Sequence, residues 1–259
     1  AHRYQKISRV FHPMLHKVSH VCAQGEGDYR NYLALGLPNQ KLTLTNNIKF
    51  DQVGSVSTAS PSFMGLENHD RPVLVAGSTH APEEEVIIEA AKLLWKAHPT
   101  LVVVIVPRHP ERFDTVAELL VSHEITFTRC SSASAFESNK SVVLLDEMGR
   151  LNNAYSVGTF AFVGGSIADR GGHNALEPAA FAIPILMGPN TYNNPVICQH
   201  LIDRGALQIA SNAQEIAQAC ETWLVSQELR QKAGSAGIEV LRENSGALSK
   251  TLECVARTL

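Results

Sequence analysis

Short apolar runs alternate with amphipathic helical segments through most of this sequence, and this alternation constrains the fold more than any other feature. Residues 101–106 form an unbroken and largely β-branched run, which is typical of a parallel strand covered on both faces. Further strands are expected at residues 73–76, 125–128, 142–145, 159–163, 184–187 and 207–210. Helices are expected near residues 82–98, 115–123, 174–182, 213–226, 227–235 and 244–258. This order predicts an α/β fold, with a Rossmann-like parallel sheet of the doubly wound kind.

The first part of the chain has a different pattern. A basic amphipathic helix is expected near residues 4–18, then a strand at 21–23, a helix at 26–35 and an apolar alternation at 42–45. The first helix could touch phospholipid headgroups, although a solvated face is the simpler interpretation. Residues 53–72 contain several Ser, Gly and Pro residues without periodicity, and we interpret them as a linker.

Composition excludes several classes of protein. A net charge of −3 with 44% hydrophobic residues does not suggest a nucleic-acid partner. No apolar run approaches the roughly 18–20 residues that a membrane span needs, and no signal-peptide pattern is present. The five cysteines are widely separated and lack a C-x-x-C pair. They are therefore expected to be free, mostly buried thiols in a reducing compartment. The first residue is Ala1 rather than Met, so we expect a fragment of a longer protein.

The loops that follow the predicted strands carry clusters of Gly, Pro and polar residues. In doubly wound sheets ligands bind at the carboxyl ends of strands, here after residues 76, 106, 145, 163 and 187. After the first of these strands, Gly77, Ser78 and Thr79 precede a helix and offer amide and hydroxyl donors to an anion. Ordinary helix capping by Ser78 or Thr79 is the alternative. No dinucleotide fingerprint and no P-loop lysine pattern occurs.

Two further loops contain candidate ligand-binding residues. Pro107 and Arg108 follow a strand, where an arginine placed by a rigid proline suits a phosphate or carboxylate, although a surface turn is the alternative. After the strand at 142–145, Met148, Gly149 and Arg150 follow Asp146-Glu147, and the glycine would let a flat base approach the backbone.

The most informative segment lies after the strand at 159–163. It contains two glycine pairs, in Gly164-Gly165-Ser166 and in Gly171-Gly172-His173-Asn174-Ala175-Leu176-Glu177. Bare amides and a helix N-terminus there can face an anionic group. Asn174 and Glu177 share one helix face, and a carboxylate in this place can accept hydrogen bonds from two ribose hydroxyls. A capping pair is the alternative, but it leaves the four glycines unexplained.

These strings resemble the 3-deoxy-D-manno-octulosonic acid (Kdo) transferases of lipopolysaccharide synthesis. The resemblance covers nearly the whole chain in order, and its most specific string is Gly-Gly-His-Asn-Ala-Leu-Glu-Pro-Ala-Ala at 171–180. The other strings are Thr-Asn-Asn-Ile-Lys-Phe-Asp at 45–51, Gly-Ser-Thr-His at 77–80, Pro-Arg-His-Pro-Glu-Arg-Phe at 107–113 and Val-Gly-Gly-Ser at 163–166.

The resemblance implies the C-terminal half of a two-domain GT-B glycosyltransferase. Residues 1–52 would be the end of the N-terminal domain and the interdomain linker. Residues 53–259 would be the CMP-Kdo-binding Rossmann-like domain, with the last helix crossing back toward the N-terminal domain. The implied reaction is inverting transfer of Kdo from CMP-Kdo to a lipid A precursor, lipid IVA, without a metal or other cofactor.

The resemblance also implies what the rest of such a protein supplies. The general base, the acceptor site and the membrane association would lie in the N-terminal domain, so no catalytic residue is expected in this chain. The fragment itself would be soluble and inactive alone. The implied location is the cytoplasmic face of the inner membrane of a Gram-negative bacterium.

Carried over by position, the resemblance assigns roles to particular residues. Pro107 and Arg108 would meet the phosphate side of CMP, and Met148, Gly149 and Arg150 would line the nucleotide. Asn174, Ala175, Leu176 and Glu177 would meet the ribose and phosphate. Further candidates are Gly77, Ser78, Thr79, Gly164, Gly165, Ser166 and Gly172. The chain departs from the family at Glu147 and Arg150, where the family usually has Thr and Glu, so only a backbone contact is expected at position 150.

Two other functions fit the same fold pattern. One is a sugar-nucleotide epimerase, which would act on a UDP-sugar and need catalytic carboxylates. The other is a nucleotide-binding module without activity that recruits partners.

Overall fold

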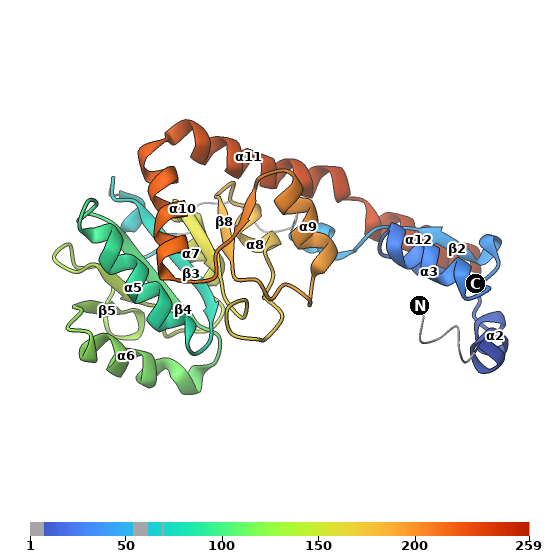
Figure 1. The fold of residues 1–259 in the computed structure, drawn as a ribbon, viewed down its shortest axis with the longest axis horizontal. Helices are drawn as coiled ribbons and strands as arrows, with labels where there is room; N and C mark the ends of the chain where they lie inside the picture. Colours follow the sequence, from blue (N-terminus) through green and yellow to red (C-terminus); the bar gives the residue numbers. More distant parts are fainter. Residues whose placement is uncertain (1–7, 54–61, 69, 259) are drawn as a thin grey trace. The chain divides into compact units, whose positions relative to one another are not determined.

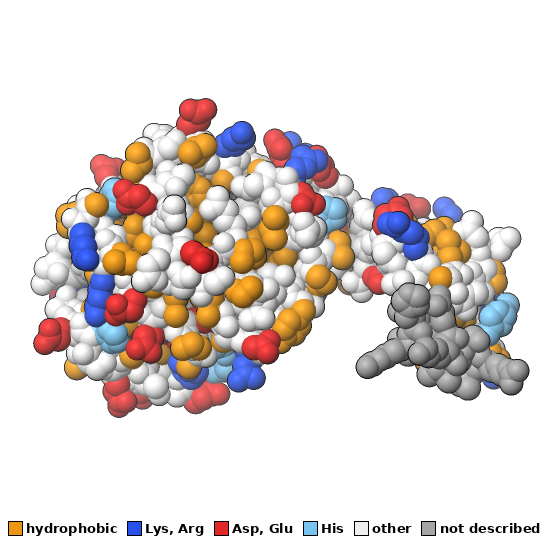
Figure 2. Space-filling model, viewed as in Figure 1, with side chains coloured by type: hydrophobic (Ala, Val, Ile, Leu, Met, Phe, Trp, Pro, Cys, Tyr) orange, Lys and Arg blue, Asp and Glu red, His pale blue; other side chains and the backbone are white. Residues whose placement is uncertain are grey.

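The computed structural model describes residues 8–53, 62–68 and 70–258. Contacts divide the chain into two units, Ala1–Val56 with Leu241–Leu259, and Ser57–Val240. Helix α11 (Gln227–Asn244) carries the chain from the second unit back to the first. On the face drawn in Figure 2, side chains of both charge signs are interspersed with hydrophobic ones.

The second unit is built on a sheet of seven parallel strands, which confirms the predicted Rossmann-like α/β fold (Figure 1). The spatial order is β5-β6-β4-β3-β7-β8-β9. After β3 and β4 the chain forms the edge strand β5, places β6 between β5 and β4, and then crosses to add β7 on the other side of β3. The strands are β3 (Val73–Thr79), β4 (Val102–Pro107), β5 (Phe127–Arg129), β6 (Val142–Leu144), β7 (Phe160–Val163), β8 (Ile185–Met187) and β9 (Leu207–Ile209).

Both faces of this sheet are apolar and covered. Leu74 packs in one buried cluster with α5 (Glu83–Trp95), α6 (Phe113–Ser122) and α10 (Ala213–Val225). Its neighbour Val75 packs in a second cluster on the opposite face, because side chains alternate along a strand. That second cluster contains residues of α7 (Leu151–Ser156).

The predicted linker at residues 53–72 is not a linker in its described part. Phe63, Met64 and Leu66 are buried in the second cluster, against β3 and β4. The prediction was wrong because these few apolar side chains have no periodicity, and only the sheet face they cover reveals their role. Residues 54–61 lie outside the described ranges.

Several helices differ from the sequence prediction. Helix α8 (Leu176–Ala179) has four residues instead of the nine expected at 174–182, and left-handed Ala182 (φ 54°) prevents its extension. Helix α11 continues past residue 235 to Asn244, and its Gly234 packs so closely on the carbonyl of Ala182 that a β-carbon would not fit. Helices α7 and α9 (Pro195–Asp203) were not predicted. The 3₁₀ turns are η1 (Asn39–Lys41), η2 (Leu66–Asn68), η3 (Pro110–Arg112) and η4 (Cys130–Ser132).

The first unit joins the two ends of the chain. The carboxylate of Asp51 accepts hydrogen bonds from the backbone amides of Gly246 and Leu248, each 2.6 Å long, where α12 begins. The elements of this unit are the parallel strands β1 (Val21–Ala23) and β2 (Leu42–Leu44), and the helices α2 (Ser8–His16), α3 (Glu26–Ala34), α4 (Lys49–Val53) and α12 (Ala247–Thr258).

Two further expectations concern the whole described chain. All five cysteines are free thiols, four of them buried and Cys22 partly so, as expected. Across residues 8–53, 62–68 and 70–258, no helix is both long enough and apolar enough to cross a bilayer.

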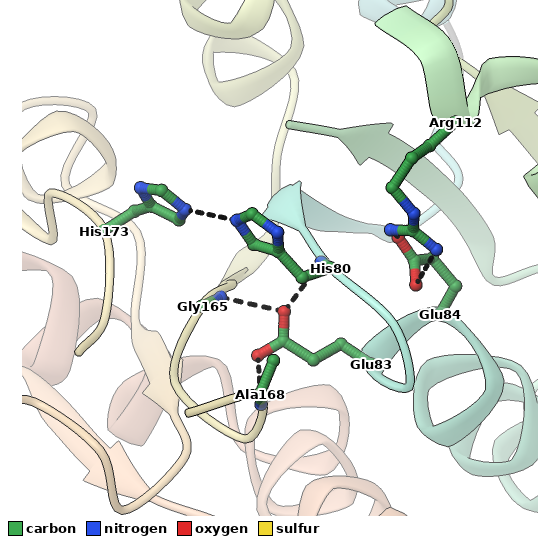
Figure 3. Close-up of polar contacts among 7 residues, drawn as sticks. All are labelled: His80, Glu83, Glu84, Arg112, Gly165, Ala168 and His173. Carbon is green, nitrogen blue, oxygen red and sulfur yellow. Dashed lines mark hydrogen bonds and ion pairs between the residues drawn. The ribbon is translucent and has the colours of Figure 1, made fainter. Parts of the chain in front are cut away.

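A buried carboxylate joins the loops after β3 and β7. Glu83, at the first position of α5, is completely buried. Figure 3 shows its carboxylate directed at the backbone of His80, Gly165 and Ala168. Its Oε2 accepts hydrogen bonds from the amides of His80 (2.9 Å) and Gly165 (2.8 Å). Its Oε1 accepts from the three amides that follow, those of Ser166 (2.8 Å), Ile167 (2.8 Å) and Ala168 (3.2 Å). The side chain therefore fixes both loops at the point where the strand order reverses.

Replacing Glu83 tests this anchor. We expect Glu83→Gln to lower the free energy of unfolding by about 3 kcal/mol, because the amide removes a charged acceptor and turns an NH₂ group toward backbone donors. Glu85→Gln, an exposed position on the same helix, should change it by less than about 0.5 kcal/mol. Urea unfolding followed by tryptophan fluorescence measures both, since Trp95 and Trp223 lie in this unit. If the two variants were equally stable, the claim that Glu83 fixes the loops after β3 and β7 would be wrong.

Candidate functional site

A pocket of about 280 Å³ opens at the carboxyl ends of the strands in the second unit. It lies where β3 and β7 are neighbours, the position at which the strand order reverses and at which such sheets bind ligands. The loops after β3, β4, β6 and β7 and helix α7 all contribute to it. Its lining residues are Ser78, Val106, Pro107, Arg108, Glu147, Met148, Gly149, Leu151, Tyr155, Val163, His173, Asn174 and Glu177.

The pocket brings together seven of the residues predicted from the sequence, at or after the ends of four different strands. They are Ser78, Pro107, Arg108, Met148, Gly149, Asn174 and Glu177. Nine other predicted residues do not line it, namely Gly77, Thr79, Arg150, Gly164, Gly165, Ser166, Gly172, Ala175 and Leu176. The loop after β8 was also expected to bind the ligand, because it follows the carboxyl end of a strand, but it contributes no lining residue to this pocket.

Arg108 brings a positive charge to the pocket. The backbone turns sharply after β4, where the amide of Arg108 donates a hydrogen bond to the carbonyl of Thr79 (3.0 Å). The residue is exposed at the pocket edge. Its guanidinium is close enough to influence the pKa values of both Glu177 and His173. This arrangement suits an anionic ligand, because a guanidinium can bind phosphate or carboxylate in bidentate fashion.

Asn174 and Glu177 form a second polar part of the pocket lining. The Nδ2 group of Asn174 donates to Glu177 Oε1 (3.2 Å), while its Oδ1 accepts from the amide of Leu176 (3.2 Å). The Asn174 side chain therefore binds the first amide of α8, although the N-cap position is occupied by Ala175 and has no side-chain cap bond, so the predicted capping box does not form. Both Asn174 and Glu177 also line the pocket. Burial raises the pKa of Glu177, and the Asn174 hydrogen bond and the Arg108 charge oppose that rise. Its carboxylate retains capacity for further donors.

Tyr155 is a buried wall of the pocket that the sequence did not reveal. The ring comes from α7 and is 1% exposed, and its hydroxyl occupies the space that a side chain at Gly77 would need. Gly77 therefore makes room for Tyr155. Burial, with a smaller effect of the Glu177 charge, raises the pKa of Tyr155 well above its usual value. The phenol accordingly stays protonated and is a neutral polar group.

The loop after β6 presents Glu147 rather than Arg150 to the pocket. Arg150 pairs with Glu147, and its guanidinium carbon lies 5.6 Å from the centre of the Phe63 ring. Gly149 adopts a left-handed conformation (φ 81°) with no atoms near the position of a β-carbon, so this backbone is open to a flat ligand. Met148 beside it is 58% exposed. The carboxylate that this loop brings to the pocket is therefore that of Glu147.

The backbone amides of the glycine-rich segment bind groups of the protein itself, among them the carboxylate of Glu83. The amides of Gly165 and Ser166 donate to Glu83, that of Gly164 to the carbonyl of Gly77 (2.8 Å), and that of Gly172 to the carbonyl of Gly165 (2.8 Å). These amides are engaged within the protein and do not face the pocket. Because α8 has only four residues, its dipole is also weak. The positive charge of the pocket therefore depends on side chains.

Three imidazoles lie at one side of the pocket. His173 lines it, and its Nε2 is 2.9 Å from Nε2 of His80 (Figure 3). The ring of His109 makes an edge contact with His80, with 5.2 Å between the ring centres. None of the three was among the ligand-binding residues predicted from the sequence. Within the described part of the chain, no group of three His, Cys, Asp or Glu side chains is arranged to hold a metal ion.

Known proteins resemble this chain along its whole length. Residues 1–52 match the family described as 3-deoxy-D-manno-octulosonic-acid transferase, and residues 82–240 match the glycosyl transferases group 1. A 3-deoxy-D-manno-octulosonic acid transferase of Haemophilus influenzae is 40% identical over 98% of this chain. The chain spans 60% of the length of that relative.

Solved structures support the same relationship. The C-terminal CMP-Kdo binding domain of WaaA from Acinetobacter baumannii has a TM-score of 0.65 at 34% identity, and the match covers 75% of this chain and 99% of that domain. The UDP-GlcNAc 2-epimerase of Neisseria meningitidis has a TM-score of 0.58 at 17% identity, over 92% of this chain and 61% of the epimerase, which indicates the fold alone. The chain therefore belongs to the glycosyl transferases group 1 and, within them, to the 3-deoxy-D-manno-octulosonic acid transferases.

Proposed function

We propose that this chain is the donor-binding part of an inverting glycosyltransferase that moves Kdo from CMP-Kdo to a lipid A precursor. The observation that carries the proposal is the single pocket that gathers Arg108, the Asn174–Glu177 pair and the Glu147–Gly149 loop. These groups match a nucleoside monophosphate, which has one phosphate, two ribose hydroxyls and one flat base. The relative described as a CMP-Kdo binding domain supports this choice of donor.

Each side of the pocket has a role in this proposal. Arg108 binds the phosphate, and Glu177, held by Asn174, accepts hydrogen bonds from the ribose hydroxyls. The base lies against Met148 and the open backbone of Gly149. Tyr155 closes the floor with a neutral hydroxyl.

The proposed chemistry needs little beyond these groups. When the bond between sugar and phosphate breaks, negative charge grows on the departing CMP, and the guanidinium of Arg108 stabilises it. The acceptor hydroxyl attacks the opposite face of the sugar carbon, which inverts its configuration. The base that removes the hydroxyl proton, the lipid acceptor site and the attachment to the cytoplasmic face of the inner membrane are proposed to belong to other parts of the protein.

Two alternatives lead to different outcomes. An epimerase would bind a UDP-sugar in this pocket, and the fold likeness to UDP-GlcNAc 2-epimerases is compatible with that. A module that only recruits partners would bind a nucleotide without turnover in the full-length protein. Kdo transfer by the full-length protein that is lost on Glu177→Ala would exclude the recruiting module.

Calorimetric titration of CMP, UDP and CMP-Kdo against this chain tests the donor site. We expect CMP and CMP-Kdo to bind and UDP to bind more weakly. Arg108→Ala should weaken the binding of CMP by about tenfold or more, because the substitution removes a charge-assisted hydrogen bond to the phosphate. The control Lys232→Ala removes an exposed positive charge on α11 away from the pocket and should leave CMP binding unchanged. Tighter binding of UDP than CMP, or no effect of Arg108→Ala, would contradict the proposal.

The proposal includes transfer without a metal ion. Arg108 supplies the positive charge that a divalent cation provides at many diphosphate-sugar sites, and a single phosphate needs less compensation. We therefore expect excess EDTA to leave CMP binding, and Kdo transfer by the full-length protein, unchanged within about twofold. Loss of either that added Mg²⁺ restores would show that this part of the proposal is wrong.

A further inference from the structure

The cluster formed by His80, His109 and His173 comes from three loops that meet beside the pocket. His80 follows β3, His109 follows β4 and His173 precedes α8. The rings of His80 and His173 are nearly parallel, with an angle of 9° and 5.1 Å between their centres. Their Nε2 atoms are 2.9 Å apart, which is hydrogen-bonding distance. His173 also lines the pocket with Arg108, so the cluster is continuous with the proposed phosphate position.

The surroundings of the two rings are predominantly positive. The charged and titratable groups that influence them are His109, Arg108, Arg112, Arg170 and Glu84. Glu84 forms an ion pair with Arg112, and nearby Glu83 is fully occupied by backbone amides. Among the described residues, neither imidazole forms an ion pair with a carboxylate. The two rings therefore lie among cationic side chains and, in the described part of the chain, have no carboxylate partner of their own.

The bond between the two imidazoles limits their protonation. One Nε2 must donate a hydrogen and the other must accept it, so both rings cannot be charged while the bond exists. Burial and the neighbouring positive groups lower the pKa of His173 to about 4 and also lower the pKa of His80. At neutral pH both rings are therefore uncharged. The donating ring can take up one proton at Nδ1 without breaking the bond, once a negative group nearby compensates the charge.

The proposed donor carries a second negative group in a suitable place. An octulosonic acid is a keto acid, so its carboxylate is attached to the same carbon that bears the phosphate. Two anionic groups one carbon apart need two cationic positions side by side. Arg108 provides one of them, and the paired imidazoles provide the other.

On the basis of the proposed function, we infer that His80 and His173 bind the carboxylate of the donor sugar and take up one proton when it binds. This assigns to the imidazole pair the recognition of acidic sugars, while Arg108 and Glu177 recognise the nucleotide. A donor with a neutral sugar would lose this contact. The affinity for the acidic donor would decrease as pH rises, because the proton must come from solution.

The test compares CMP-Kdo with an analogue in which the carboxylate is reduced to a primary alcohol. Both are phosphodiesters, so neither has the phosphate ionisation near pH 6 that complicates CMP itself. Calorimetry on the full chain should show that the wild type prefers CMP-Kdo by about tenfold near neutral pH. The preference should decrease by up to about tenfold between about pH 6 and about pH 8.

The matched variants are the double variant His80→Asn/His173→Asn and the control His200→Asn, an exposed histidine of α9. The double variant should lose the preference and its pH dependence, so that CMP-Kdo binds it no more tightly than the alcohol analogue does. The control should behave like the wild type. If the double variant keeps the preference for CMP-Kdo over the alcohol analogue, the inference is wrong while the proposed donor site stands. If the wild type binds neither CMP nor CMP-Kdo, the proposed function itself fails.

A second measurement needs no variant. Titrations of the wild type in buffers of different ionisation enthalpy count the protons taken up on binding. Up to one proton is expected for CMP-Kdo at about pH 7 and none for the alcohol analogue. Equal proton counts for the two ligands would overturn the inference.

Discussion

The structure of the second unit depends on one buried carboxylate. Glu83 accepts hydrogen bonds from one amide in the loop after β3 and from four consecutive amides in the loop after β7. Removing a carboxylate from water is very costly, and only this set of donors makes it tolerable. One of these two loops follows Ser78 at the end of β3, and the other leads to His173, and both residues line the pocket. The geometry of the pocket therefore follows from a side chain that does not line it.

This arrangement also decides how the pocket attracts an anion. Glycine-rich loops commonly offer backbone amides to a ligand, but here Gly165 and Ser166 offer theirs to the protein itself. The positive charge at the pocket is therefore that of Arg108, to which, in the inference above, the imidazole pair adds one charge when the ligand binds. The carboxylates of Glu147 and Glu177 at the same pocket favour ligands that also carry hydroxyl or amino donors. A nucleotide attached to an acidic sugar meets both requirements.

The sequence predicted the sheet well because its signals are local. The β-branched run that forms β4 is buried on both faces, and its own residues are enough to indicate this. The predicted strand ends were correct to within a few residues. The rule that parallel sheets bind ligands at strand ends then located seven of the lining residues. Glu83 and Tyr155 could not be found in this way. Their roles depend on partners about eighty residues away, which no local pattern encodes.

The carboxylate of Asp51 holds the start of α12, almost two hundred residues later in the chain. The first unit therefore consists of the beginning and the end of the sequence, with the second unit inserted between them. A ribosome releases residues 57–240 before it releases the segment that completes the first unit. The seven-stranded sheet can thus fold during synthesis, while the early segments wait without their partner helix. Of these two units, the first is begun before the second and completed after it.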